Sequence, residues 1–325
     1  ATTEIYTLSH TTLFRSDIMG GDFAPRTNVE GAIKALAELP NSARIVLIGD
    51  SNQAKAILAE HDVDESQFDF VHTTQVVDMG EHPTRALKLK PDSSISKGFE
   101  LLKRGEIDSF GSAGNSGAIL VGAMFSIRPI LGVYRPCVAS IVPKQDGKEA
   151  VILDVGIVAD CKPDVLYQFA VLGSIYAEFV YGIEKPRVGL LNIGEEKEKG
   201  NLLTQATYQL MEGTSDFNFV GNVEGRDIYG GGVDADVIVC DGFTGNVVLK
   251  QAEAFYKLIA TRGLLDDYFK RFNYENYGAT PVLGVNGNVL LAHGISSAEA
   301  IKSMLLLSRD LVDAKLPQKI QAAFK

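Results

Sequence analysis

The sequence has no tryptophan, and its 325 residues include only three cysteines, Cys137, Cys161 and Cys240. Three cysteines so far apart suggest neither a disulfide framework nor a C-x-x-C metal pair, and this usage fits a reducing compartment. Histidine and cysteine do not cluster at the spacing of metal ligands. We therefore expect no metal and no cofactor.

Basic residues are also in deficit, since 31 Lys and Arg against 41 Asp and Glu give a formal net charge of −10. General nucleic-acid binders are usually basic, so we expect no nucleic-acid partner. No apolar run is long enough to span a bilayer, and the first twelve residues lack the basic flank and apolar centre of a signal peptide. These absences predict a cytoplasmic protein, and they leave peripheral contact with a membrane open.

What the chain does contain is a repeated order of apolar strands and amphipathic helices. Continuous apolar runs typical of buried strands occupy residues 44–50, 150–156, 187–194 and 236–241. Runs with helical spacing of apolar residues lie between and after them, and Asn28, Ser93 and Asn201 are predicted to cap three such helices. This alternation predicts an α/β fold with a mostly parallel sheet.

A glycine-rich segment, GSAGNSGA at residues 111–118, lies between a short predicted strand and an apolar helix. Small residues at such a turn let backbone N–H groups approach a ligand, and a helix N-terminus favours an anion. A second such turn, residues 242–246, precedes a helix predicted from Val247 to about Ala260. The alternative is tight packing, with Asn and Ser capping their helices. The predicted phosphate-binding residues are Ser112, Gly114, Asn115, Ser116, Gly117, Gly242, Thr244, Gly245 and Asn246.

Ligands of parallel sheets bind beyond the carboxyl ends of the strands, where this chain places several polar or glycine-rich segments. We expect these segments to share one cleft, lined by Asp17, Met19, Gly20, Gly21, Asp22, Arg85, Asp154, Asn192, Glu195, Asn222 and Glu224.

Three further residues are candidate catalytic groups. His293 is either a proton donor poised near neutral pH or a loop histidine bonded to backbone. Lys162 would balance the charge of phosphate, and Asp241 would orient the anion site or accept a phosphate proton. Cys161 is either an activated nucleophile or, as we favour, a buried inert thiol.

Aromatic and basic residues interleave between Lys250 and Tyr274. One interpretation is an amphipathic helix at a subunit interface. The other is a docking surface for an acidic partner or for lipid headgroups.

Several of these stretches together resemble the bacterial phosphate acyltransferases that act on acyl-[acyl carrier protein]. DIMGGDFAP at residues 17–25 is similar to the family's opening D-x-M-G-G-D-x-A-P. Further similar stretches follow in family order at residues 112–118, 189–196, 221–227, 241–247, 277–279 and 293–294. Ile157 and Val158 replace a small residue and an asparagine of the family pattern, and the segment from Lys250 to Tyr277 is short for the family.

The resemblance implies a three-layer α/β/α sandwich, like phosphotransacetylases and isocitrate/isopropylmalate dehydrogenases, as one domain over residues 13–325. Residues 1–12 would be an extension outside the family pattern. It also implies a homodimer that transfers a long-chain acyl group from acyl carrier protein to inorganic phosphate, for the first acylation of glycerol 3-phosphate. Peripheral membrane contact would run through residues 250–274. We expect phosphate to attack directly, without an acyl-enzyme.

Three alternatives remain at this point. A protein of the same fold would use an acyl-CoA donor, as phosphotransacetylases do. A dehydrogenase is weaker, because the dinucleotide fingerprint is missing. A phosphate-binding regulator without catalytic activity is the third.

Overall fold

The computed structural model describes residues 12–325. The expected extension at residues 1–12 therefore lies outside the described residues, apart from Thr12, which begins the first strand. The strands are β1 (Thr12–Asp17), β2 (Ala43–Gly49), β3 (Phe68–His72), β4 (Ser109–Ser112), β5 (Cys137–Pro143), β6 (Glu149–Leu153), β7 (Arg187–Asn192), β8 (Asn218–Glu224), β9 (Val237–Val239), β10 (Ala279–Leu283) and β11 (Asn288–Ala292).

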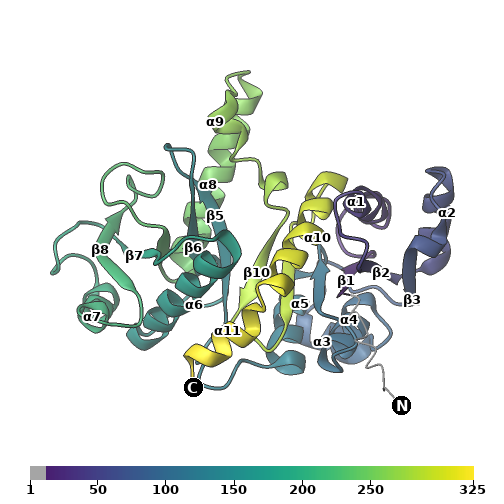
Figure 1. Cartoon of the computed structure of the whole chain (residues 1–325), viewed down its shortest axis with the longest axis horizontal. Coiled ribbons are helices and arrows are strands. Elements are labelled where there is room, and N and C mark those ends of the chain that lie inside the picture. The colour runs from purple at the N-terminus through teal and green to yellow at the C-terminus, as the bar shows by residue number, and fades with distance from the viewer. Residues whose placement is uncertain (1–11) are drawn as a thin grey trace, which may run out of the picture.

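Helices cover both faces of the sheet (Figure 1). The α-helices are α1 (Arg26–Leu36), α2 (Ser51–Glu60), α3 (Pro83–Leu89), α4 (Ser94–Lys103), α5 (Ser116–Gly122), α6 (Pro163–Tyr181), α7 (Leu202–Met211), α8 (Gly242–Thr261), α9 (Asp267–Lys270), α10 (Ala298–Asp313) and α11 (Leu316–Ala323). A π-helical turn, Ala123–Ile127, continues α5, and short 3-10 turns lie at Glu65–Gln67 and Tyr274–Asn276. No helix within residues 12–325 is both long enough and apolar enough to cross a membrane.

All described strands join one sheet, in the order β3-β2-β1-β4-β11-β10-β5-β6-β9-β7-β8. Pairing is parallel from β3 to β11 and again from β6 to β8, and it is antiparallel around β10 and β5 in the centre. The predicted α/β class with a mostly parallel sheet is therefore confirmed. The carboxyl ends of the two parallel sets lie on either side of the central antiparallel strands, where a site can draw residues from both halves.

Successive side chains along each strand point to opposite faces of the sheet, and this alternation produces the three layers. On β6, Val151 and Leu153 pack in one hydrophobic cluster with α6, whereas Ile152 between them belongs to the cluster on the other face. Both clusters are extensive, so each face of the sheet is buried under helices, as expected for parallel strands. This arrangement confirms the three-layer α/β/α sandwich.

Some helix starts differ from the sequence prediction. Ser93 and Asn201 cap α4 and α7 as predicted. Asn28 does not cap a helix, because it lies inside α1, where its side-chain amide donates to the carbonyls of Ile18 and Gly20. The second glycine turn is not a turn before a helix at Val247 either, since residues 242–246 form the first turns of α8.

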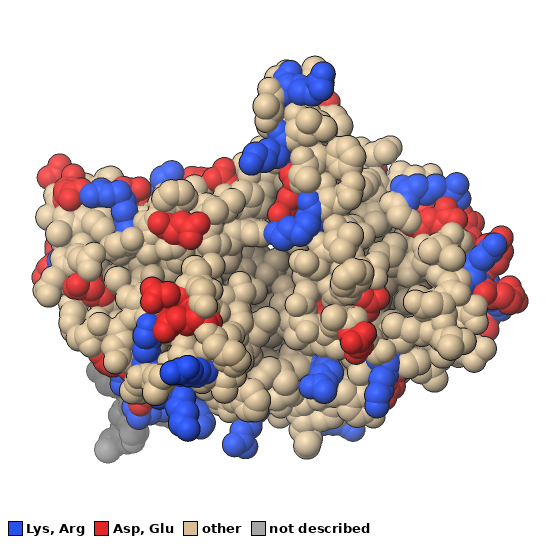
Figure 2. Space-filling model, turned by 180° about the vertical axis from the view of Figure 1, so that it is seen from behind, with Lys and Arg blue, Asp and Glu red and all other residues tan. Residues whose placement is uncertain are grey.

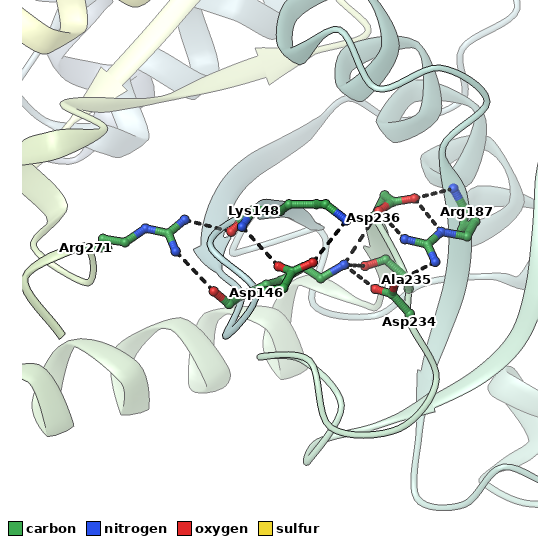
Figure 3. Close-up of polar contacts among 8 residues, drawn as sticks. Asp146, Lys148, Arg187, Asp234, Ala235, Asp236 and Arg271 are labelled. Carbon is green, nitrogen blue, oxygen red and sulfur yellow. Dashed lines mark hydrogen bonds and ion pairs between the residues drawn. The ribbon is translucent and has the colours of Figure 1, made fainter. Parts of the chain in front are cut away.

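Helix α8 and the short α9 rise out of the body as a protrusion (Figure 1). Its base is tied to the turn between β5 and β6 (Figure 3), because the Arg271 guanidinium donates to the carbonyls of Lys144 at 3.1 Å and Lys148 at 2.7 Å. On the other side of this turn, the buried Lys144 ammonium pairs with Asp234 and, at 3.7 Å, with Asp236. Lys144 therefore joins the base of the protrusion to the sheet.

Replacing Lys144 with methionine is expected to lower the free energy of unfolding by about 3 kcal/mol. The Asp236 side chain is only 9% exposed and would lose one of two cationic partners, keeping Arg187 at 2.8 Å. Chemical denaturation would measure this loss. The matched control is Lys148→Met in the same turn, where the side chain is 68% exposed and the change should stay within about 0.5 kcal/mol. Equal losses of stability in the two variants would contradict the role of Lys144 in joining the base of the protrusion to the sheet.

Candidate functional site

A polar pocket opens where the two halves of the sheet meet. Its side chains come from the start of α5, the loop after β6, the first turns of α8 and the loop after β11. The residues that line it are Ser116, Leu120, Val138, Val155, Gly156, Ile157, Asn246, Leu249, Lys250, Thr280, Leu291, Ala292, His293 and Gly294. Both predicted glycine turns thus contribute a residue to the same pocket, as do both halves of the molecule.

His293 follows β11 directly, and its half-buried ring lies against α8. The ring Nε2 is 3.4 Å from Glu253 Oε1, and the ring of Tyr274 meets the imidazole edge-on at 5.0 Å. Burial lowers the pKa of His293, the Glu253 carboxylate opposes this shift, and the Lys250 ammonium adds to it. The imidazole is therefore neutral at neutral pH, so that it can both accept and donate a proton.

Lys250 and Glu253 form a pair on α8 that the sequence analysis did not identify as part of the site. Lys250 Nζ lies 3.0 and 2.7 Å from the two Glu253 carboxylate oxygens. Lys250 lines the polar pocket, and Glu253 faces His293 on the adjacent turn of the helix. A carboxylate beside a histidine and a cation beside an anion site are recurring arrangements in catalysis. Their i,i+3 spacing was visible in the sequence, but nothing there connected them to His293.

The first glycine turn is held by its own side chains. Asn115 caps α5 through Ala118 N–H at 2.9 Å, and its amide donates to the carbonyls of Asp78, Met79 and Glu81 at 3.0 to 3.1 Å. The amide protons of Asn115 are therefore used within the protein.

Ser112 is likewise engaged, because its hydroxyl donates to Asp17 at 2.6 Å. Burial raises the pKa of Asp17, and the hydrogen bond from Ser112 opposes this shift. A methyl group at Gly20 would lie 2.5 Å from the backbone nitrogen of Gly114, so glycine allows these two loops to touch. Among the predicted phosphate ligands of this turn, only Ser116 lines the polar pocket.

The second glycine turn packs against the loop after β6. The Asp241 carboxylate caps α8, accepting hydrogen bonds from the Thr244 N–H and hydroxyl at 2.8 Å each. Methyl groups at Gly242 and Gly245 would collide with Asp154, at 2.5 Å from Oδ2 and 2.0 Å from the backbone oxygen. Asp241 and Thr244 line a different pocket, together with Asn192. From this turn only Asn246 reaches the polar pocket.

Asp154 organises the loop that borders the polar pocket. Its carboxylate accepts hydrogen bonds from the backbone N–H groups of Val138, Ile157 and Val158 at 2.7 to 3.0 Å. Burial raises the pKa of Asp154, and these N–H donors oppose the shift. At Ile157 and Val158 the loop therefore bonds to Asp154 through backbone N–H groups. The family that the sequence resembles has a small residue and an asparagine at these two positions. Ile157 then presents an apolar side chain to the pocket.

The remaining predicted residues lie away from the polar pocket. Lys162 is exposed just before α6, and Arg85 is exposed on α3. The loop of Met19, Gly21 and Asp22 touches the site only indirectly, through the Asp22 N–H, which donates to the carbonyl of Gly294 at 2.7 Å. The last predicted residues, Asn192, Glu195, Asn222 and Glu224, lie at or just after the ends of β7 and β8. There the Asn192 amide donates to the Asn222 side-chain oxygen, and Arg226 pairs with Glu195 and Glu224.

Within residues 12–325, no three His, Cys, Asp or Glu side chains gather closely enough to hold a metal ion. The titratable groups of the polar pocket are instead Lys250 and the neutral His293, and Glu253 contacts His293 from α8. Such a set can bind an anion by charge and hydrogen bonds and can move a proton.

Comparisons with known proteins show which family the chain belongs to. The family model described as "Fatty acid synthesis protein" matches residues 15–261. Curated phosphate acyltransferases are similar over almost the whole chain: that of Dictyoglomus turgidum is 40% identical, covering 94% of this chain and 95% of its own. That of Desulforamulus reducens is 42% identical, covering 95% and 96%.

Solved structures show the same fold at low identity. EutD phosphotransacetylase from Staphylococcus aureus has a TM-score of 0.63 at 15% identity, covering 93% of this chain and 94% of its own. A branched-chain phosphotransacylase from Enterococcus faecalis has a TM-score of 0.61 at 15% identity, covering 92% and 99%. The family match and the curated relatives identify an acyltransferase, and the chain belongs to the phosphate acyltransferase family.

Proposed function

We propose that this chain transfers a long-chain acyl group from acyl-[acyl carrier protein] to inorganic phosphate, giving acyl phosphate for the first acylation of glycerol 3-phosphate. The observation that carries this proposal is the polar pocket, where a lysine, an asparagine, a serine and a neutral histidine converge. Phosphate is itself a nucleophile, so a site that only positions it and moves its proton is sufficient.

In this proposal phosphate binds in the polar pocket, next to Lys250, Asn246 and Ser116. Lys250 supplies the positive charge and Asn246 and Ser116 supply hydrogen bonds. This modifies the sequence-based expectation, in which Asn115, Asp241 and Lys162 contributed side chains. The first two have their polar atoms engaged elsewhere, and the third is exposed outside the pocket.

The proposed reaction needs one proton transfer. An oxygen of the hydrogen phosphate dianion attacks the thioester carbonyl, the new C–O bond forms and the C–S bond breaks. The phosphate proton passes to His293, which delivers it to the departing thiolate of the carrier. Glu253 stabilises the imidazolium that exists between these two transfers, since its carboxylate is 3.4 Å from the ring.

Direct attack is preferred to an acyl-enzyme because the candidate thiol is unreactive. Burial, with the nearby Asp154 and Asp241 carboxylates, raises the pKa of Cys161 to about 12. Its thiol donates to the carbonyl of Val158 at 3.3 Å, and it does not line the polar pocket. A thiol of this kind supplies almost no thiolate at neutral pH.

The proposal includes a homodimer formed through α8. This helix exposes Phe243, Val247, Phe255 and Leu258, each at 49% to 67% of its surface. Large exposed apolar side chains along one helix indicate a partner surface. Light scattering should give twice the chain mass of 35.1 kDa, and Phe255→Glu should shift it toward the single mass, whereas Lys257→Glu should not. A wild-type protein of single mass would contradict this part.

Membrane contact through residues 250–274 is also part of the proposal. Leu264, 64% exposed, lies in the turn between α8 and α9 at the end of the protrusion. Figure 2 shows Lys and Arg side chains on the protrusion, with some Asp and Glu side chains and uncharged surface between them. Apolar residues beside basic ones suit peripheral binding to anionic lipid.

The test of the function is to mix the protein with long-chain acyl-[acyl carrier protein] and phosphate, trap acyl phosphate with hydroxylamine and count the released carrier thiol. We expect hydroxamate and thiol to appear in equal amounts, and only with phosphate. A parallel reaction with acyl-CoA tests the donor of phosphotransacetylases. Thiol release that ignores phosphate would indicate a thioesterase, and no release from either donor would favour a phosphate-binding regulator.

A further inference from the structure

His293 begins the loop that joins β11 to α10, and hydrogen bonds from other segments hold the backbone of this loop. The carbonyl of Gly294 accepts a hydrogen bond from the Asp22 N–H at 2.7 Å. The carbonyl of Ile295, the next residue, accepts one from the Tyr274 hydroxyl at 3.2 Å. The backbone that carries the imidazole is therefore supported from two sides, and one support is a side chain.

Tyr274 touches this loop at two places. Besides the bond from its hydroxyl to Ile295, its ring lies against the imidazole of His293, with 5.0 Å between the ring centres and 66° between the ring planes. Aromatic rings in such an edge-on arrangement attract each other and prefer a defined orientation. The first contact holds the backbone two residues after the histidine, and the second limits the rotation of its ring.

The 3-10 turn that carries Tyr274 is itself firmly held. At its start the Asn273 side chain accepts a hydrogen bond from the Glu275 N–H at 3.2 Å and donates one to the Glu275 carboxylate at 2.9 Å. This carboxylate also accepts a hydrogen bond from the Ser297 hydroxyl, at the start of α10. Three residues before Tyr274, Arg271 is bonded to the turn between β5 and β6. Tyr274 thus reaches His293 from a segment fixed on both sides.

Tyr274 also covers one side of the imidazole. The charged groups that act on the ring are Glu253, at 3.4 Å, and Lys250, both on α8. Burial raises the pKa of the Tyr274 hydroxyl, so this side chain stays uncharged at neutral pH. Its effect on the histidine is therefore to exclude water. Burial is the largest cause that lowers the pKa of His293, and the ring of Tyr274 supplies part of it.

We infer that Tyr274 is a positioning residue for His293, which holds the imidazole in place at the polar pocket and keeps water from one side of it. Tyr274 does not line the polar pocket, so it acts through the histidine. The inference rests on the proposed function, in which the imidazole carries a proton from phosphate to the departing thiolate. Such a group must stay within hydrogen-bond reach of both partners, and a small displacement lowers the rate.

The test compares Tyr274→Leu and Tyr274→Phe with wild type in phosphate-dependent acyl transfer. The leucine variant loses both contacts, so its kcat should fall about 10- to 100-fold, while the KM for phosphate stays within about twofold. Because less of the imidazole is then buried, the pKa of His293 should rise, and the acid limb of the pH profile should move to higher pH. The phenylalanine variant keeps the ring and should therefore recover most of the rate and keep the wild-type profile.

Tyr167→Leu is the matched control. Tyr167 also packs against an aromatic ring, that of Phe217 at 5.2 Å, and its hydroxyl donates to Asp216 at 2.6 Å, but it lies on α6 and does not line the polar pocket. This variant should lose stability and keep the wild-type pH profile. A Tyr274→Leu enzyme with the wild-type profile would overturn the inference even at a reduced rate, because a general loss of structure lowers the rate without moving the profile.

An NMR titration of ring-labelled histidine provides a readout that needs no turnover, with the His293 signal assigned from its loss in His293→Gln. In Tyr274→Leu, or in Tyr274→Met if the leucine variant does not fold, the pKa of His293 should be higher than in wild type. If it is higher but wild type turns over no donor, the proposed function fails and the positioning of the imidazole stands. If wild type turns over the donor and the pKa is unchanged in the variant, only the role of Tyr274 fails.

Discussion

Replacing His293 with glutamine is expected to lower kcat for phosphate-dependent acyl transfer by about 10²- to 10³-fold. Glutamine keeps a hydrogen-bonding side chain of similar length next to Glu253 but cannot take a proton from phosphate and pass it on. The KM for phosphate should change little, because the charge that attracts the anion is on Lys250. Initial rates at saturating donor and phosphate measure both constants.

The pH profile adds a readout that a structural role would not give. The neutral imidazole is the active form, and burial lowers the pKa of His293 below its ordinary value of 6.5. At a fixed concentration of the phosphate dianion, wild-type activity should therefore persist below pH 6.5 and fall only as the pH passes the lowered pKa. In the glutamine variant this acid limb should be missing. His61→Gln, at an exposed histidine paired with Glu30, is the control and should keep both rate and profile. A full-rate His293→Gln enzyme would remove His293 from the reaction.

Replacing Lys250 with methionine is expected to raise the KM for phosphate about 10- to 100-fold. A hydrogen bond to a charged group contributes about 1.5–3 kcal/mol, which converts to this range. Lys257→Met is the matched control, since this lysine is exposed two turns further along α8 and does not line the polar pocket. Phosphate titrations at saturating donor measure the change.

Lys250 also acts on His293, and the sign of that effect can be worked out. The Lys250 ammonium lowers the pKa of His293, whereas Glu253 raises it. Without the lysine, the glutamate acts unopposed, the pKa rises and the acid limb of the pH profile moves to higher pH. A variant in which only the KM for the carrier increases would show that Lys250 contacts the donor, and would contradict its place in the phosphate site.

The sequence predicted the fold well because its signals are local. The apolar runs at residues 44–50, 150–156, 187–194 and 236–241 form the buried strands β2, β6, β7 and β9, and Ser93 and Asn201 cap the next helix through their own backbone neighbours. Asn28 was misread for the opposite reason, since its amide bonds to carbonyls of the loop before α1. The central strands β10 and β11 were not predicted. Pro281 lies within β10, and proline weakens the sequence signal for a strand.

The candidate site was only partly predictable, because it depends on contacts between distant segments. Glycines at 242 and 245 suggest an anion cradle in the sequence, yet they serve close packing against Asp154. Lys250 and Glu253 read as surface residues of an amphipathic helix. Only the fold brings that helix to His293, some forty residues later in the chain. Asn246 and His293, in contrast, were predicted and do line one pocket.

The measurement that tests the central claim most directly uses phosphate labelled with ¹⁸O at all four oxygens. The protein is incubated with this phosphate and long-chain acyl-[acyl carrier protein], and the mass of the lipid product is measured by mass spectrometry. Attack by a phosphate oxygen predicts acyl phosphate that carries all four ¹⁸O atoms and forms in an amount equal to the free carrier thiol. Free carrier accompanied only by unlabelled fatty acid would contradict it, because water rather than phosphate would then be the acceptor.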